Sequence, residues 1–166
     1  MSDMKAIHPK AVTEYAASLL TNGWHVGELR QDGFGRIYRC VQNAEAATAF
    51  KAKYAVAWKA QTTLTGECIY PTGSGAYDIA GIAQSAIPVD YYGWVLCSGH
   101  GSLICDTTTG VDVVVSQGII AYSTGGKGQG YTPATAAEAD AVFAVAQEGS
   151  TSGTLEEISV FVKGIL

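Results

Sequence analysis

Short runs rich in β-branched and aromatic residues recur along most of this chain, and Gly, Asp, Asn and Ser separate them every few residues. Such runs favour extended strands joined by tight turns, because branched and aromatic side chains pack well on a pleated surface. Strands this short and closely spaced are typical of a mainly β protein, a small barrel or sandwich with mostly antiparallel pairing. The predicted strands are 25–30, 36–42, 54–59, 77–82, 91–97, 102–106, 111–115, 118–122, 142–147 and 155–162.

The final strand shows the clearest alternation. Ile158, Val160 and Val162 occupy every second position and are expected to face the core. Glu157 and Phe161 then lie on the opposite face of the same strand.

The best candidate for a helix is residues 9–22, where apolar side chains recur at helical spacing. Pro9 suits the first turn of such a helix, and Gly23 suits its end. We therefore expect residues 1–23 to form an N-terminal helix or arm and residues 24–166 to form one β-rich domain.

Two minor helical turns are also expected. Asn43 can cap a short helix over 44–51. Thr135 and Glu138 have capping-box spacing, which indicates a helical turn near Ala136.

Two glycine-containing segments are predicted to be connections. Residues 31–35 (QDGFG) form a hairpin turn, since glycine adopts the positive φ that tight hairpins require. Residues 124–130 (TGGKGQG) have the composition of a mobile loop. A phosphate cradle is disfavoured there, because Tyr131, Thr132 and Pro133 follow in place of the helix that would receive the anion.

The charge composition restricts the possible partners. Of 166 residues only 15% are charged and 48% are hydrophobic, which predicts a protein surface that contacts another protein. The net charge is −5 without any run of Lys or Arg, so nucleic acid and acidic membrane surfaces are poor partners. The N-terminus lacks the pattern of a secretory signal, so we expect a cytoplasmic product with reduced thiols at Cys40, Cys68, Cys97 and Cys105.

One cluster could in principle carry chemistry. Cys97, His100 and Cys105 lie close in sequence, and zinc binds sulfur and imidazole ligands. The fourth ligand would have to be Cys40 or Cys68, and neither has the paired spacing of a closed zinc site. The acidic residues are scattered and the histidines lie in different segments, so no catalytic site, metal site or cofactor is expected, and we predict that the chain is not an enzyme.

Aromatic residues have two possible roles. The run Tyr91-Tyr92-Gly93-Trp94 opens a predicted strand, where Trp94 can anchor the core or, alternatively, contribute to an interface. In the N-terminal segment, Tyr15, Leu19 and Leu20 form an apolar face and are the leading candidates for an interface with a partner.

Three stretches together resemble the small capsid cement or decoration proteins of tailed bacteriophages. The first is 27–41 (GELRQDGFGRIYRCV), in which a glycine, an Asp-Gly turn and an arginine-aromatic-arginine strand follow one another at Gly27, Asp32, Gly33, Arg36, Tyr38 and Arg39. The second is 78–95 (DIAGIAQSAIPVDYYGWV), which contains the distinctive Tyr92-Gly93-Trp94. The third is the closing segment 142–162. The family usually has a glycine near Lys53, and this chain does not.

The resemblance implies a β-tulip-like or small-barrel body that binds the outer surface of the expanded icosahedral capsid and cements neighbouring major capsid subunits. It further implies Tyr91, Tyr92, Gly93, Trp94, Arg36, Tyr38 and Arg39 as motif or core residues, self-association as a dimer or trimer, and assembly onto the virion after synthesis in the host cytoplasm. Two alternatives remain: a tail, baseplate or head-fibre β-module, and a small Cys/His metal-dependent enzyme.

Overall fold

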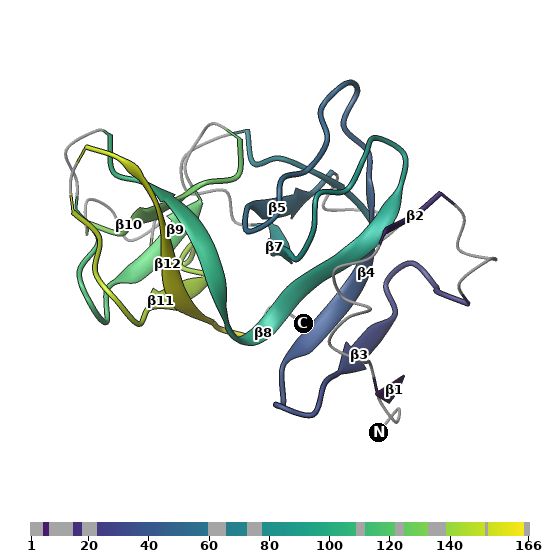
Figure 1. Cartoon of the computed structure of the whole chain (residues 1–166), viewed down its shortest axis with the longest axis horizontal. Coiled ribbons are helices and arrows are strands. Elements are labelled where there is room, and N and C mark those ends of the chain that lie inside the picture. Colours follow the sequence, from purple (N-terminus) through teal and green to yellow (C-terminus); the bar gives the residue numbers. More distant parts are fainter. Residues whose placement is uncertain are drawn as a thin grey trace.

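The computed structural model of the chain describes residues 5–6, 15–17, 23–59, 66–72, 78–108, 112–121, 125–132, 139–151 and 153–164. Strands dominate these residues (Figure 1), so the predicted mainly β class is confirmed. Within the described ranges, no helix has the length and apolar character that crossing a bilayer requires.

The strand pairings close into two rings that share one long strand, β8 (Tyr92–Asp106). The first ring continues from β8 through β4 (Ile37–Asn43), β6 (Glu67–Ile69), β5 (Ala55–Trp58) and β7 (Ile79–Ala83). The second continues from β8 through β10 (Gly128–Gly130), β9 (Gly118–Ala121), β11 (Ala144–Ala146) and β12 (Leu155–Val162). Figure 1 shows β8 running from the first ring, on the right, to the second, on the left.

Three short strands join the first ring from outside. β1 (Lys5–Ala6) pairs with β3 (Leu29–Gln31), β3 pairs with β4, and β2 (Tyr15–Ala16) pairs with β8. The pairings β1–β3, β4–β6 and β8–β10 are parallel and the other pairings are antiparallel, as expected for a mostly antiparallel protein.

The strand β8 replaces two predicted strands and the turn between them. Trp94 and Leu96 point into one core cluster, and the next residues of β8 in that cluster are Leu103 and Cys105. The residues of β8 that face this cluster are even-numbered before the middle of the strand and odd-numbered after it. Side chains of a regular strand alternate between its two faces, so this change requires one irregular step. The step lies at the centre of β8, where the register with β4 shifts and Gly99 has a φ of 105°.

The predicted helix over 9–22 is wrong where the structure describes it. Tyr15 and Ala16 form β2 and pair with Gly93 and Tyr92 of β8. Extended backbone is favoured here because the edge of β8 offers hydrogen-bonding groups, and because Ala16 points inward while Tyr15 points outward. Leu19 and Leu20 lie outside the described residues, as does the helical turn expected near Ala136.

The predicted helix over 44–51 is also wrong. Asn43 does not cap a helix: its side-chain amide donates to the carbonyl oxygens of Thr48 (3.1 Å) and Ile87 (2.8 Å). Phe50 then forms an isolated bridge with Ile87. A buried asparagine that binds the backbone on both sides holds the segment in an irregular loop, in competition with helical hydrogen bonds.

Two connections also differ from expectation. In the predicted strand 111–115, the described residues contain only an isolated bridge, between Val113 and Ser150. In the predicted mobile loop 124–130, residues 128–130 form β10, between β8 and β9. A Cβ at Gly128 would lie 2.5 Å from Leu103, so glycine here allows close packing of strands.

The strand β6 was not predicted.

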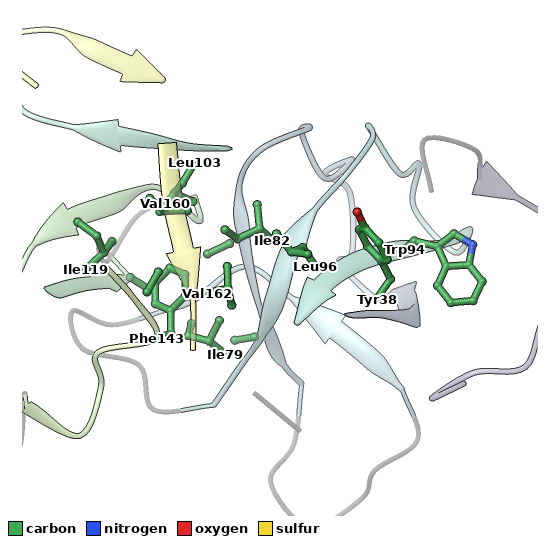
Figure 2. Close-up of a cluster of buried hydrophobic side chains, with 14 of the residues drawn as sticks. Tyr38, Ile79, Ile82, Trp94, Leu96, Leu103, Ile119, Phe143, Val160 and Val162 are labelled. Carbon is green, nitrogen blue, oxygen red and sulfur yellow. The ribbon is translucent and has the colours of Figure 1, made fainter. Parts of the chain in front are cut away.

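The core runs through both rings. One cluster extends from Trp94 and Tyr38 in the first ring, through Ile82 and Leu96, to Ile119 and other side chains in the second (Figure 2). A second cluster covers the other side of the first ring, where Val95 and Cys97 of β8 are also buried. The first half of β8 is therefore buried on both faces. The predicted inward positions of β12, Ile158, Val160 and Val162, are confirmed.

Lys53 adopts a φ of 67°, a left-handed conformation that glycine adopts more easily than lysine. This is the region where the decoration proteins usually have a glycine. The Lys53 carbonyl accepts a hydrogen bond from Ile104 of β8, and its ammonium group pairs with Glu157 of β12 at 2.5 Å. These contacts connect the first ring to the second and stabilise the unusual backbone.

Candidate functional site

An exposed aromatic and cationic surface lies where the two rings meet. It consists of Phe34, Arg36, His100 and Phe161, and we call it the Phe34 surface. Phe34 is 80% exposed, and Phe161 is 39% exposed. Large exposed apolar side chains gathered in one place indicate a surface that binds another molecule.

The hairpin between β3 and β4 presents Phe34, and Asp32 shapes this hairpin as predicted for residues 31–35. The Asp32 carboxylate accepts hydrogen bonds from the backbone amides of Phe34 (2.9 Å) and Arg36 (3.0 Å). It also accepts from the Tyr38 hydroxyl at 3.1 Å. An aspartate that binds the backbone amides of its own turn fixes the turn, and so fixes the direction in which Phe34 projects.

Arg36 is held in place beside Phe34. Its Nε donates to the buried Asp32 carboxylate at 2.7 Å. Its guanidinium carbon lies 5.3 Å from the centre of the Phe34 ring and 5.8 Å from that of Tyr38, within the range of cation–π attraction. The stem of Arg36 lies against Gly99 of β8, where a Cβ would be 3.1 Å from Cγ of Arg36.

The buried groups under the hairpin have shifted protonation equilibria. Burial alone would raise the pKa of Asp32, but the hydrogen bonds from Arg36, Phe34 and Tyr38 outweigh it, and this pKa lies below the ordinary 3.8. Burial also raises the pKa of Tyr38. Asp32 is therefore ionised and Tyr38 is protonated at neutral pH, which is the arrangement that holds Arg36.

The strands β8 and β12 supply the other half of the Phe34 surface. His100 and Phe161 are directly opposite in the register of these strands, and their ring centres lie 5.0 Å apart, edge to face. Phe34, Arg36 and His100 line an open hollow of about 440 Å³. The sequence did not predict this grouping. Its one visible signal was a phenylalanine in a turn of otherwise polar and glycine residues.

The residues predicted as motif or core positions lie in β4 and β8 or, for Arg36 and Tyr91, directly before these strands. Trp94 and Tyr38 are fully buried, and Tyr92 is partly buried against their cluster. The side chain of Ile87 packs against Gly93, in the space that a Cβ would need. The Arg39 guanidinium lies 5.2 Å from the Trp58 ring centre.

Of the predicted interface residues, the structure describes Tyr15. Its ring is half exposed and contacts the partly buried ring of Tyr91 edge to face, with centres 5.8 Å apart. This pair forms a second, smaller aromatic surface at β2.

The cysteines lie apart from the Phe34 surface. All four are free and buried. Burial raises the pKa of Cys40, Cys97 and Cys105 to about 12, and that of Cys68 also rises. Such thiols stay protonated at neutral pH and make poor nucleophiles and metal ligands. His100 is exposed, and among the described residues no three His, Cys, Asp or Glu side chains group as a metal site would require.

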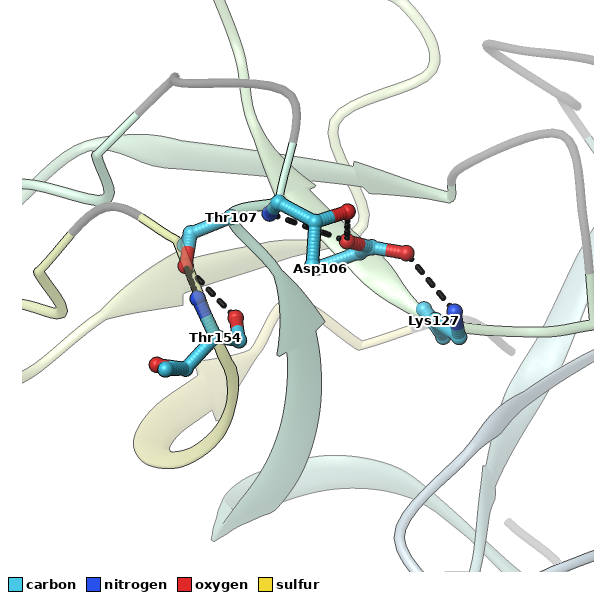
Figure 3. Close-up of polar contacts among 5 residues, drawn as sticks. Asp106, Thr107, Lys127 and Thr154 are labelled. Atoms are coloured by element: carbon cyan, nitrogen blue, oxygen red, sulfur yellow. Dashed lines mark hydrogen bonds and ion pairs between the residues drawn. The ribbon is translucent and has the colours of Figure 1, made fainter.

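A mostly buried ion pair fixes the far end of β8 (Figure 3). The Lys127 ammonium group donates to the Asp106 carboxylate at 2.7 Å, and the Thr108 hydroxyl donates to the same carboxylate. Beside them, the Thr107 hydroxyl donates to the Thr154 carbonyl at 2.6 Å. The hydrogen bond from Lys127, followed by that from Thr108, lowers the pKa of Asp106 below its ordinary 3.8.

We expect Lys127→Met to lower the free energy of unfolding by about 1 to 3 kcal/mol at pH 7, because it leaves a buried carboxylate without its cation. The loss should shrink below about pH 4. A carboxyl group with a lowered pKa contributes stability above its unfolded pKa, and this contribution is lost as the pH falls through the folded pKa.

Urea unfolding at pH 7 and pH 3 measures both effects. The matched control is Lys59→Met, since Lys59 and Glu67 form a half-exposed pair at 3.5 Å that should contribute less than about 1 kcal/mol. An equal loss for Lys127→Met at both pH values would contradict the assignment to Asp106.

No model of a known protein family matches the sequence, and no curated protein matches it either. Among solved structures, the head fiber gp8.5 N base in bacteriophage phi29 is similar, with 14% identity and a TM-score of 0.48. The similarity covers 77% of this chain and 94% of that chain. The identity is too low to transfer the role of any residue from that protein to this one.

Proposed function

We propose that this chain is a structural protein of a bacteriophage particle. It binds the outer surface of the expanded icosahedral capsid and cements neighbouring major capsid subunits. The observation that carries this proposal is the Phe34 surface, because a fixed, exposed group of aromatic and cationic side chains is suited to binding a protein.

Three further features support the proposal. The sequence motifs at 27–41 and 78–95 resemble decoration proteins. The low charge and the net charge of −5 suit contact with protein and not with nucleic acid or an acidic membrane. The buried thiols with raised pKa values are unsuited to nucleophilic catalysis. In this proposal the chain performs no reaction and needs no cofactor.

A capsid presents many equivalent positions, which lets weak contacts suffice. If the protein also self-associates as a dimer or trimer, each bound copy raises the effective concentration of the next contact. One exposed hydrophobic surface for each copy is then enough for stable attachment.

Co-sedimentation of the purified protein with expanded and unexpanded shells of its parent phage tests the proposal. We expect saturable binding to expanded shells alone, on the order of hundreds of copies per particle. Phe34→Ala should weaken this binding at least about tenfold, since exposed aromatic side chains at an interface contribute most of its binding energy. Val114→Ala is the matched control, because Val114 is also exposed (61%) but lies outside the Phe34 surface.

Binding to neither shell would overturn the proposal. Attachment of only a few copies, at a tail or a vertex, would instead favour a tail, baseplate or head-fibre module. Equal effects of Phe34→Ala and Val114→Ala would show that binding does not use the Phe34 surface.

A further inference from the structure

The hollow beside Phe34 is lined by both aromatic and cationic side chains. The Phe34 ring and the His100 imidazole form aromatic sides, and the Arg36 guanidinium provides a cation. Phe161 extends the aromatic side beyond His100. A volume of about 440 Å³ is enough for an aromatic or branched side chain with a polar group attached.

Arg36 is pre-organised as a binding group. An ordinary surface arginine loses much rotational freedom when it binds, and this loss weakens the interaction. Here the Asp32 carboxylate and the rings of Phe34 and Tyr38 already fix the guanidinium. Little further ordering is needed when a ligand arrives.

Arg36 also keeps hydrogen-bonding capacity. Among the described residues Asp32 is the hydrogen-bond partner of its side chain, and this bond uses only Nε. Asp32 itself is satisfied by two backbone amides and the Tyr38 hydroxyl. The terminal nitrogens of a guanidinium donate in the parallel geometry that a carboxylate accepts.

From these contacts we propose that the hollow binds the C-terminal residue of the capsid partner, an aromatic or branched apolar residue whose α-carboxylate is free. The carboxylate accepts hydrogen bonds from the terminal nitrogens of Arg36, and the apolar group packs between Phe34 and His100. This inference rests on the proposed function for the identity of the partner, and on the hollow alone for its chemistry.

At the solvent-facing side of the hollow, charge complementarity favours a carboxylate over a neutral group. The side chain of Asp32 is fully buried, and the described residues that line the hollow present no carboxylate to solvent. The Asp32 carboxylate already neutralises Arg36, so the attraction comes from the terminal nitrogens of Arg36, which can still donate hydrogen bonds to a carboxylate at the solvent-facing side. The site therefore provides orientation as well as attraction.

A small probe tests the chemistry without any capsid. N-acetyl-phenylalanine carries a ring and a carboxylate, and N-acetyl-phenylalaninamide lacks only the charge. Titration of each into the full chain can be followed by NMR through the ring protons of His100, one of only three histidines. We expect the acid to bind about tenfold more tightly than the amide, which corresponds to about 1.4 kcal/mol.

Variants locate the binding. Arg36→Gln should abolish the difference between acid and amide, whereas Phe34→Ala should weaken both probes. Arg39→Gln is the matched control, because Arg39 also lies over an aromatic ring, at 5.2 Å from that of Trp58, but not at the hollow. Phe34 is 80% exposed, so its replacement keeps the variant folded even if Arg36→Gln disturbs the hairpin.

Equal binding of acid and amide, or no response at His100, would overturn the carboxylate site. If that happens while expanded shells still bind the protein, the proposed function survives and this inference fails. If the acid binds at Arg36 but no shell binds the protein, the site is supported and the proposed function fails.

Discussion

Replacement of Gly126 by alanine is expected to be among the most damaging single substitutions in this chain, with a loss of about 3 to 5 kcal/mol in the free energy of unfolding. Gly126 has a φ of 75°, and a Cβ there would collide with the carbonyl oxygen of Ala55 and lie 2.6 Å from the Tyr70 ring. The Gly126 carbonyl accepts a hydrogen bond from the Ala55 amide at 2.6 Å. An added methyl group would therefore separate the two rings at a point where their backbones touch.

The preceding residue provides a matched control. Gly125 has nearly the same φ, 74°, but an added Cβ would meet no atom of the described residues within 4 Å. Gly125→Ala should cost only about 1 to 2 kcal/mol, the ordinary penalty for a left-handed non-glycine residue. Urea unfolding of both variants separates close approach from backbone strain. Equal losses for the two would contradict the tight junction at Ala55.

Trp94→Ala is expected to lower the free energy of unfolding by about 3 to 5 kcal/mol, because it empties the largest fully buried side chain of the core. The Trp94 ring contacts that of Trp24 edge to face, with centres 5.5 Å apart, and the Arg30 guanidinium lies 5.0 Å from its centre. Removal of the ring takes away all of these contacts at once.

Trp94→Phe tests the same position with an aromatic ring retained. Within the described part of the chain, the indole Nε1 of Trp94 has no hydrogen-bond partner. Phenylalanine removes this unsatisfied donor, which offsets part of the lost volume, so the loss should stay below about 2 kcal/mol. Chemical unfolding of both variants gives the comparison. A loss as large for phenylalanine as for alanine would contradict this account of the indole nitrogen.

The sequence was most informative where one face of a strand is buried. The limits of β12 were predicted correctly from the alternation of Ile158, Val160 and Val162 against polar neighbours. The hairpin at residues 31–35 was predicted because an Asp-Gly pair favours one local geometry. In both cases, neighbouring residues alone determine the conformation.

Prediction failed where distant segments decide the conformation. Residues 98–101 (SGHG) have the composition of a turn. The first half of β8 pairs with β4 of the first ring and the second half pairs with β12 of the second ring, so glycine there bends β8 without reversing it. The glycines of β10 indicate a loop by composition, but they allow strands to approach closely. For the same reason the Phe34 surface could not be predicted, because Arg36 and His100 come to line one hollow only through the pairing of β4 with β8.

The shared strand also limits how the chain length can change during evolution. Most surface loops accept insertions and deletions, since their ends stay where they were. Loss or gain of one residue between Leu96 and Leu103 would turn the inward side chains of β8 in one ring to the outer face, while β8 in the other ring kept its own alternation. We expect natural variants to differ in length at the connections and to keep this stretch of β8 constant in length, whatever residues occupy it.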